Sequence, residues 1–316
     1  MNKTGLLKKC LSFLLAIIII STICIPAFAA ETKQGWVEEN GKKYYYYQDG
    51  FQAKGGVFRT KDGLYYFDEN GVLFEDTGWI CYTYGEDYPV KLYAENGILC
   101  IGWKEIDGKK YYFADDWLGG PALNICQGFA FPIEKNSDGT YVYYAFYEDG
   151  ALADDSLGWT EIRNCKFYLE EGGVCKLGWL EDDGEKYYFD PYMVSNRSWS
   201  IKNEETGKSY PYVFEKDGKL THRTGWVTFN TALGIQRYYV GQNGIAKTGW
   251  QTIKNSKGVA YKYFFNRYDG EMYTGLRNIE DENKKVNTYY FGDNGYMRTG
   301  WQTIKDENGV AHKYYF

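Results

Sequence analysis

The sequence predicts an all-β fold, a solenoid of about 12 stacked two-stranded β-hairpins. Tyr, Phe and Trp make up 19% of the 316 residues, yet the mean hydropathy is −0.54, so the chain combines many rings with a polar surface. The dipeptide Gly-Trp returns at intervals, and Asn-Gly or Asp-Gly pairs lie between aromatic segments. Aromatic residues favour strands, and these pairs favour tight hairpin turns.

The composition excludes several other classes. A polytopic membrane protein would need several long apolar runs, and the sequence has one, at its N-terminus. A disordered chain would be poor in aromatic residues. A helical bundle would be rich in Leu, Ala and Met, and only 4 Met are present. The 2 His leave little material for acid–base or zinc chemistry.

One period of the repeat reads as a hairpin. In residues 102–113, Asp107-Gly108 separates a strand that begins with Trp103 from the aromatic segment 111–113. Residues 35–46 and 178–189 keep the same order. Asp-Gly and Asn-Gly tolerate the positive φ angles of a two-residue primed turn. Each period is therefore expected to form a β-hairpin followed by a short connector, which carries a second Asn/Asp-Gly pair.

The period recurs through the whole of residues 31–316. Successive copies lie roughly 20 to 30 residues apart, a spacing typical of solenoids and arrays. A lone hairpin is marginally stable, so each is expected to stack its aromatic face on the next. Gly-Trp occurs at Trp36, Trp79, Trp103, Trp159, Trp179, Trp226, Trp250 and Trp301, with degenerate copies at Gly56-Val57, Gly128-Phe129, Ser198-Trp199 and Gly275-Leu276.

Two periods are longer than the others, at residues 114–157 and 190–224. The extra residues are interpreted either as tolerated loop growth or as joints that open grooves between hairpins. The joints of interest place Trp103 near Trp117 and Phe129, and Trp179 near Trp199. No Pro- or Ser-rich linker divides the chain, and no segment is left over for a separate catalytic domain.

The N-terminus has the layout of a secretory signal peptide. Lys3, Lys8 and Lys9 precede an apolar run over residues 11–25, and residues 27–29 form a small-x-small cleavage site. The alternative is an uncleaved membrane anchor. We expect cleavage, which leaves residues 30–316 as one repeat domain that is secreted, cell-wall associated and not an integral membrane protein.

Charge and cysteine content narrow the partners further. The net charge is −6, and it becomes −9 without residues 1–29, which carry three Lys and no acidic residue. An acidic chain disfavours nucleic acid. Five cysteines remain, an odd number, so at least one is unpaired within the chain. Cys165 and Cys175 either bridge within one hairpin or act as small buried residues, and without a CxxC pair no metal site is expected.

The pattern Gly-Trp-x4-Gly-Lys-Lys-Tyr-Tyr-Phe followed by Asp/Asn-Gly resembles the cell-wall-binding (choline-binding-type) repeat of Gram-positive bacteria. That family includes the glucan-binding regions of streptococcal glucosyltransferases and the receptor-binding repeats of clostridial toxins, and the present repeats are most similar to these two groups. The resemblance implies a non-catalytic hairpin solenoid attached to the bacterial surface or to a glycan.

In choline-binding members of the family, a quaternary ammonium lies in a cage of rings from successive repeats. The Gly-Trp tryptophan gives one wall, and a Trp just before the Tyr-Tyr pair gives a second. At this second position the present sequence has Lys43, Leu64, Lys110, Lys186, Arg237, Lys262, Thr288 and Lys313, none of them aromatic. A lysine would repel choline, so the resemblance favours neutral sugars held by stacking and hydrogen bonds.

The predicted function is that of an exported, non-catalytic carbohydrate-binding protein that attaches to cell-wall polysaccharide through repeated aromatic sites, without a cofactor. The alternatives are a choline-dependent binder of teichoic acid and an adhesin for host glycans. Any one ring is also a candidate for the solenoid core alone. The candidate ligand-binding residues are Trp36, Trp79, Trp103, Tyr112, Trp117, Phe129, Trp159, Trp179, Tyr188, Trp199, Trp226, Trp250, Tyr290 and Trp301.

Overall fold

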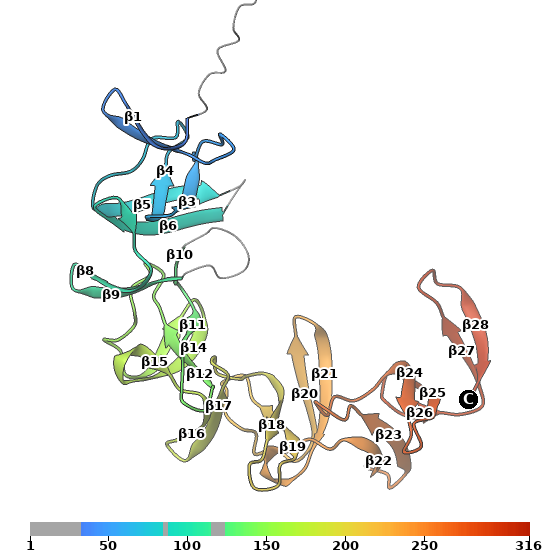
Figure 1. Ribbon diagram of the computed structural model, residues 1–316. Helices are drawn as coiled ribbons and strands as arrows, with labels where there is room; N and C mark the ends of the chain where they lie inside the picture. The colour runs from blue at the N-terminus through green and yellow to red at the C-terminus, as the bar shows by residue number, and fades with distance from the viewer. Residues whose placement is uncertain (1–32, 85–87, 115–123) are drawn as a thin grey trace, which may run out of the picture. The chain divides into compact units, whose positions relative to one another are not determined.

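The computed structural model describes residues 33–84, 88–114 and 124–316 (Figure 1). The predicted signal peptide, residues 1–29, and the candidate Trp117 lie outside these ranges. The chain divides into two compact units, which are described separately. Unit 1 comprises the residues up to Lys104 together with Tyr112–Ile125, and unit 2 comprises Glu105–Tyr111 and Cys126–Phe316. The boundary passes through the fourth hairpin.

The described residues form antiparallel hairpins in chain order, which confirms the all-β prediction. The first four hairpins are β1 (Gly35–Glu39) with β2 (Lys42–Tyr46), β3 (Gly56–Thr60) with β4 (Gly63–Phe67), β5 (Gly78–Tyr84) with β6 (Tyr88–Glu95) and β7 (Ile98–Leu99), and β8 (Gly102–Ile106) with β9 (Lys109–Ala114) and β10 (Asn124–Ile125).

Unit 2 continues with eight hairpins. Hairpins five to eight are β11 (Ala130–Lys135) with β12 (Tyr141–Ala145), β13 (Gly158–Ile162) with β14 (Cys165–Glu170), β16 (Gly178–Asp182) with β17 (Glu185–Phe189), and β18 (Arg197–Lys202) with β19 (Ser209–Phe214). The short strand β15 (Val174–Cys175), which follows the 3₁₀ turn η1 (Glu171–Gly173), joins hairpins five and six into one five-stranded sheet.

The last four hairpins complete unit 2. They are β20 (Gly225–Thr231) with β21 (Gly234–Val240), β22 (Gly249–Lys254) with β23 (Ala260–Phe265), β24 (Gly275–Glu280) with β25 (Val286–Phe291) and β26 (Met297–Arg298), and β27 (Trp301–Lys305) with β28 (Ala311–Tyr315). A second 3₁₀ turn, η2 (Gln242–Gly244), lies in the connector after β21.

The turn chemistry is as predicted. Asn40 and Gly41 have φ angles of 54° and 72°, and Asp107 with Gly108 and Asp183 with Gly184 fall in the same left-handed region. Two successive residues with positive φ define the primed turn that matches strand twist. Seven of the eight glycines in the Gly-Trp pairs, all except Gly78, also have positive φ, 81° at Gly158 for example, and a Cβ at several of these positions would meet nothing nearby. Glycine is used there for its backbone freedom.

One backbone hydrogen bond recurs between successive hairpins. The N–H of Leu73, in the connector after the second hairpin, donates to the carbonyl of Lys43 in the first at 2.9 Å. The same bond runs from Leu220 to Lys186 at 2.7 Å. Further copies join Leu152 to Lys110, Met193 to Lys166, Ala246 to Pro211, and Met272 to Arg237. Six connectors are thus fixed to the hairpin before their own, which supports the predicted stacking of hairpins in chain order.

The core follows the aromatic-strand residue that lies opposite the glycine at the start of the hairpin, as Phe67 lies opposite Gly56 and Phe265 opposite Gly249. Phe67, Phe113 and Phe265 are fully buried, as are the smaller Ala94 and Val240 at the same register position. Partly buried rings pack around this row: Trp36 and Tyr45, for example, contact the cluster of Ala53, Tyr65 and Phe67. The core is therefore a series of separate hydrophobic clusters, each formed by neighbouring hairpins.

The five cysteines of the described residues are free. Cys126 and Cys175 are buried, and burial raises the pKa of each thiol to about 12. Cys165 packs against the same hydrophobic cluster that contains Cys175. Of the two alternatives left open by the sequence, the structure shows no bridge between Cys165 and Cys175: Cys175 is a small buried residue, and Cys165 is partly exposed.

Candidate functional site

The strand register defines one position in each hairpin that we call the platform position. It follows the glycine position of the repeat and faces a residue of the aromatic strand, as Trp36 lies opposite Tyr45 and Trp179 opposite Tyr188. In chain order the twelve platform residues are Trp36, Val57, Trp79, Trp103, Ala130, Trp159, Trp179, Ser198, Trp226, Trp250, Leu276 and Trp301.

Two of the degenerate copies assigned from the sequence are wrong by one residue. Ser198 lies opposite Val213, so Ser198 holds the platform position and Trp199 follows it. Likewise Ala130 lies opposite Ala145, and Phe129 occupies the place of the glycine. Side chains alternate between the two faces of a strand, so a slip of one residue moves Trp199 to the face opposite the platforms.

Each platform tryptophan packs edge-on against its own hairpin. The centroids of Trp179 and Tyr188 are 5.3 Å apart at an interplanar angle of 76°, and those of Trp103 and Tyr112 are 5.2 Å apart at 74°. Tyr112 and Tyr188, both candidates from the sequence, are therefore the lateral partners of platforms. Tyr290 lies opposite Leu276 and stacks on Phe316 at 5.7 Å.

Five platform tryptophans also contact two rings of the following hairpin. Trp179 lies 5.0 Å from Tyr212 and 5.9 Å from Phe214. Trp36, Trp159, Trp226 and Trp250 make the corresponding pairs of contacts with Tyr65 and Phe67, Tyr187 and Phe189, Tyr263 and Phe265, and Tyr289 and Phe291. Three rings thus meet at right or oblique angles, an arrangement that favours ring contacts energetically.

The platform sequence has a period of three hairpins. Val57, Ala130, Ser198 and Leu276 belong to the second, fifth, eighth and eleventh hairpins, and the other eight carry tryptophan. A second position varies in step with it, two residues before the platform's cross-strand partner. The tryptophan hairpins have a basic residue there: Lys43, Lys91, Lys110, Lys166, Lys186, Arg237, Lys262 and Lys313. The others have Leu64, Tyr143, Pro211 and Thr288.

This basic residue lies on the same hairpin face as the tryptophan and reaches it in two cases. Lys91 Nζ is 4.3 Å from the centroid of Trp79, and Lys262 Nζ is 4.4 Å from that of Trp250. An ammonium at this distance over an indole makes a cation–π contact. The protein's own cation therefore occupies the ring face that a ligand's quaternary ammonium would need.

Other copies of the basic residue bind carboxylates instead. Lys43 forms an ion pair with Glu75 at 2.5 Å, and Lys110 with Asp154 at 3.3 Å. Glu75 and Asp154 both lie two residues after the connector residue that makes the recurrent backbone bond. Trp36 keeps its indole N–H in a hydrogen bond to Asp62 at 3.0 Å.

The platforms are partly exposed. Trp103 and Trp179 are 38% exposed, whereas Trp301, which no further hairpin follows within residues 33–316, is 72% exposed. The lysine-covered Trp79 and Trp250 fall in the intermediate range. Tryptophan burial is thus supplied by the next hairpin, and a substantial part of most platform rings still faces solvent.

A groove of about 550 Å³ adjoins Trp179. Tyr212 and Leu220 of the next repeat line it, together with the polar side chains Glu181 and His222. This lining combines one indole, one phenol and groups that donate or accept hydrogen bonds. Such a mixture suits the apolar faces and hydroxyl edges of a sugar.

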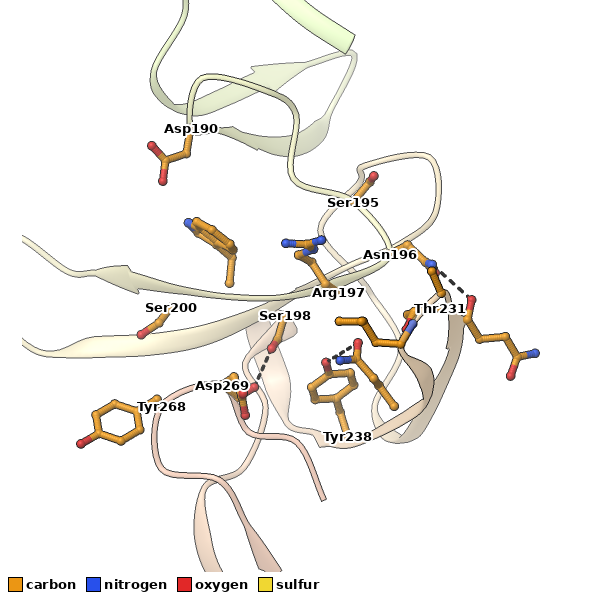
Figure 2. A pocket seen from close by; sticks show the side chains of 15 residues that line it. Asp190, Ser195, Asn196, Arg197, Ser198, Ser200, Thr231, Tyr238, Tyr268 and Asp269 are labelled. Carbon is orange, nitrogen blue, oxygen red and sulfur yellow. Dashed lines mark hydrogen bonds between the residues drawn. The ribbon is translucent and has the colours of Figure 1, made fainter. Parts of the chain in front are cut away.

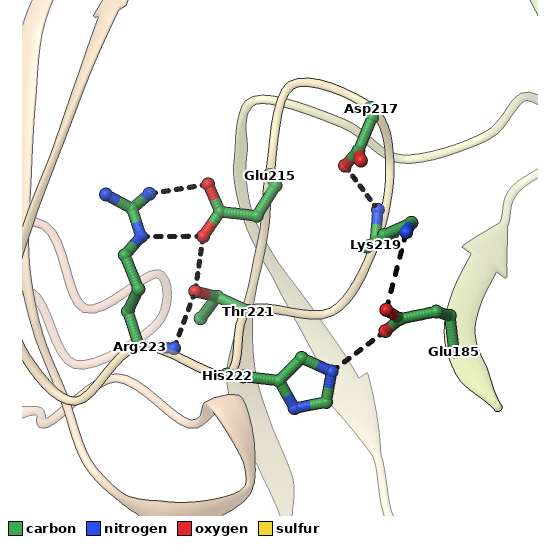
Figure 3. A network of polar contacts seen from close by, with 7 residues as sticks. All are labelled: Glu185, Glu215, Asp217, Lys219, Thr221, His222 and Arg223. Atoms are coloured by element: carbon green, nitrogen blue, oxygen red, sulfur yellow. Dashed lines mark hydrogen bonds and ion pairs between the residues drawn. The ribbon is translucent and has the colours of Figure 1, made fainter.

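A polar network holds the connector beside this groove (Figure 3). Glu185 contacts His222 Nε2 at 2.8 Å and Lys219 Nζ at 3.4 Å. The hydrogen bond with His222, aided by Lys219, lowers the pKa of Glu185. Arg223 makes a two-pronged pair with Glu215, at 2.8 Å and 2.5 Å. His222 is thus a surface residue that orients a connector.

The structure separates Trp179 from Trp199, which the sequence placed together. Trp179 lines the groove just described, whereas Trp199 lines a different groove. Phe129 carries the guanidinium of Arg163 at 5.1 Å. The sequence reasoning also missed Tyr212, Lys91 and Lys166. These residues lie at a fixed distance in sequence from the cross-strand partner of a tryptophan. They can be recognised only once the strand register is known.

Two further observations limit the chemistry. Over the ranges 33–84, 88–114 and 124–316, no group of His, Cys, Asp or Glu side chains is arranged to hold a metal ion. In the same ranges no helix has the length and apolar character needed to cross a bilayer.

Comparison with known proteins identifies the family of these repeats. A family model described as a choline-binding repeat matches residues 33–77, and one described as a putative cell wall binding repeat matches residues 101–116 and 178–191. Glucosyltransferase-S of Streptococcus mutans serotype c is 30% identical over 329 residues, which cover 84% of this chain and 20% of that protein.

Two other similar proteins are Glucosyltransferase-I of Streptococcus downei and a crystal structure of choline binding protein F from Streptococcus pneumoniae. The former is 26% identical over 298 residues, covering 82% of this chain and 17% of that protein. The latter is 18% identical, covers 89% of this chain and 92% of that one, and has a TM-score of 0.34. The chain spans about a fifth of the length of the two glucosyltransferases. The chain therefore contains repeats of the choline-binding, cell-wall-binding family.

Proposed function

We propose that this chain is an exported, non-catalytic protein that attaches to a polysaccharide of the bacterial cell wall through its platform tryptophans. The observation that carries the proposal is the partial exposure of these rings at one register position in eight hairpins. Four hairpins adopt the same backbone with Val, Ala, Ser or Leu there, so tryptophan is not required to form a hairpin.

Repetition supplies the affinity in this proposal. One ring–sugar contact is worth on the order of 1 kcal/mol if it resembles other aromatic contacts. A polymer that engages several platforms at once makes each later contact intramolecular, so the contributions combine through effective concentration. A long wall glycan satisfies this condition and a free monosaccharide does not.

The basic partner favours neutral sugars over choline. With an ammonium over Trp79 and over Trp250, a second cation at either ring would meet both repulsion and an occupied surface. A sugar lacks the positive charge, and its hydroxyl groups can accept hydrogen bonds from the lysine. The similarity to two glucosyltransferases is consistent with a glucan-like ligand, although this chain covers only a fifth of each.

One observation favours a second candidate, choline-dependent binding of teichoic acid, at the first hairpin. The choline-binding repeat model matches residues 33–77, and Lys43 is engaged by Glu75. Trp36 meets Tyr45 at 5.1 Å and Tyr65 at 5.0 Å, and Asp62 lies beside it. Rings with an adjacent carboxylate can hold a quaternary ammonium.

The test is co-sedimentation of residues 30–316 with purified bacterial cell walls, with free choline and soluble wall polysaccharide as competitors. The proposal predicts binding that the polysaccharide reverses and choline leaves intact. Elution by choline would establish the second candidate instead. Failure to bind walls, together with binding to host-cell glycans, would replace both with an adhesin.

A further inference from the structure

The eighth hairpin differs from the eight hairpins that carry a platform tryptophan. Its platform residue, Ser198, is only 7% exposed, and its Oγ donates a hydrogen bond to the carbonyl of Asp269 at 2.6 Å. Asp269 lies 71 residues further along, in the connector after β23. A tryptophan at position 198 would fill the space that this loop enters, so serine is what allows the contact.

This contact borders a groove of about 760 Å³ in unit 2 (Figure 2). Three segments distant in sequence line it: residues 195–200, residues 230–233 of the β20–β21 turn, and residues 268–269. Successive residues of β18 line the groove, as expected along the edge of a strand. Its volume lies within the range of roughly 300–1,000 Å³ that is typical of ligand pockets.

Hydrogen bonds fix the walls of the groove before any ligand arrives. Besides the Ser198 contact, Asn196 Nδ2 lies 3.5 Å from the Asn230 carbonyl, and the Tyr238 hydroxyl donates to Gln236 at 3.2 Å (Figure 2). Asn196 has a φ of 53°, a left-handed conformation held by its N–H bond to the Glu215 carbonyl at 2.9 Å. A preorganised site loses less entropy on binding.

The lining has two kinds of surface. Trp199 and the 81% exposed Tyr268 supply rings. The hydroxyl groups of Ser200 and Thr231 and the side-chain amides of Asn230 and Gln236 supply hydrogen-bond donors and acceptors. The guanidinium of Arg197 lies 5.9 Å from the Trp199 ring, which anchors that indole from one side. Rings for C–H faces and amides for hydroxyl groups suit a sugar.

Charge excludes the main competitors of a neutral sugar. The lining carries the carboxylates of Asp190 and Asp269 and the single guanidinium of Arg197. The local balance is negative, as is the net charge of the chain, so an anionic polymer is disfavoured. The only full cation in the lining already lies at Trp199, which disfavours a quaternary ammonium on that ring.

We infer that the groove between β18, the β20–β21 turn and the Tyr268 loop binds a short uncharged oligosaccharide, as a site separate from the tryptophan platforms. This inference rests on the proposed function for its ligand class, and it adds a built pocket to an array of single-ring contacts. The platforms bind a polymer through many weak contacts, and the pocket selects a sugar by shape and hydrogen bonding.

The test uses residues 30–316 and a panel of neutral gluco-oligosaccharides and N-acetylglucosamine oligosaccharides, with oligogalacturonate as the anionic comparison. Binding is measured by calorimetry and by saturation-transfer NMR. Tyr268→Ala changes a largely exposed residue and is expected to weaken binding of one neutral probe several-fold. Trp199→Ala is expected to weaken it at least tenfold, and Trp199→Phe, which keeps a ring, is expected to retain part of the affinity.

The matched control is Tyr141→Ala, because Tyr141 is a 47% exposed ring that lies outside the groove and holds no platform position. It should leave oligosaccharide binding unchanged. Equal affinity of Tyr268→Ala, Trp199→Ala and the unmodified chain would overturn the inference, as would stronger binding of oligogalacturonate. Wall binding without oligosaccharide binding would remove the pocket and keep the proposed function, and the reverse result would remove the proposed function and keep the pocket.

Discussion

Two classes of hairpin junction occur in this chain, and they differ in what they can offer to a ligand. In an aromatic junction, a platform tryptophan meets a phenylalanine at the end of the next aromatic strand, as Trp226 meets Phe265 at 5.9 Å. In the aliphatic junctions that begin at hairpins two and five neither residue is aromatic: Val57 shares a cluster with Ala94, and Ala130 with Leu169.

The comparison shows which positions build the fold and which are left over for function. The end of the aromatic strand is buried in both classes, with Phe265 and Ala94 both fully inaccessible. The platform position is buried at Val57, Ala130 and Ser198 and partly exposed in the aromatic class, 5% for Val57 against 42% for Trp226, while Leu276, beside a phenylalanine, is 40% exposed. Tryptophan thus adds exposed ring area to a junction that closes without it.

The largest expected effect comes from the shared buried position. Phe265→Ala removes a fully buried ring that contacts Trp226, and we expect a loss of about 3–5 kcal/mol in the free energy of unfolding. Chemical denaturation followed by circular dichroism measures it. Phe51→Ala is the control, since Phe51 is 52% exposed and should change stability by about 0.5 kcal/mol or less. Equal losses would show that the strand ends do not form the core.

An aliphatic junction can be converted into an aromatic one at the eleventh hairpin. Leu276 is 40% exposed and the next hairpin already supplies Phe316, so Leu276→Trp with Thr288→Lys should create a ninth platform. One added contact of about 1 kcal/mol corresponds to roughly a fivefold gain in wall affinity. Co-sedimentation with cell walls measures it.

The matched control for this conversion is Val57→Trp. Val57 is buried and is followed by Ala94, so tryptophan there should overpack the junction and cost about 1–3 kcal/mol without a gain in wall affinity. A similar gain in both variants would mean that the neighbouring phenylalanine is irrelevant to a platform.

The basic partner of the platform can be tested at Lys262. Lys262→Gln removes the ammonium over Trp250, which should cost about 0.5–1 kcal/mol of stability and open the ring face to cations. We expect choline to change tryptophan fluorescence in the variant and not at this site in the unmodified chain. Lys257→Gln, in the adjacent turn, is the control. A variant that ignores choline would contradict the assigned role of the lysine.

The smallest effect is a pH dependence at Glu185. Its pKa is lowered from the ordinary value of 4.5 in the folded chain, chiefly by the hydrogen bond with His222. The unfolded chain therefore binds the proton more tightly, so the stabilisation is present above pH 4.5 and is lost as the pH falls towards the lowered pKa. Melting temperatures across this range should fall less in Glu185→Gln than in the unmodified chain. Glu282→Gln, at an exposed turn, should behave like the unmodified chain.

Much of this arrangement could be predicted from the sequence. Asp107-Gly108 fixes a primed turn through local backbone preference alone, and Trp103 and Tyr112 then meet by simple counting across that turn. The assignment of Phe129 and Trp199 to the tryptophan position of the repeat was wrong, because a dipeptide that resembles Gly-Trp does not reveal the strand register. Successive side chains of a strand point to opposite faces, so an error of one residue in the register moves a side chain to the other face.

The rest of the site depends on contacts between separate repeats. The position of Lys91 over Trp79 and the bond from Ser198 to Asp269 both require the register or the fold. The period of three becomes visible only when hairpins are aligned by cross-strand partner. The sequence assigned Ser198 to the glycine position of the repeat. The structure places it at the platform position, where it binds the Asp269 carbonyl beside the groove.

The most direct test of the central claim is wall affinity after replacing two platforms by the residue that the protein itself uses at Leu276. In Trp179→Leu with Trp226→Leu, the loss of two contacts of about 1 kcal/mol each predicts roughly a 30-fold weaker affinity for purified cell walls, with an unchanged circular dichroism spectrum. Unchanged wall affinity in a folded double variant would contradict the claim that the platforms bind the wall polysaccharide.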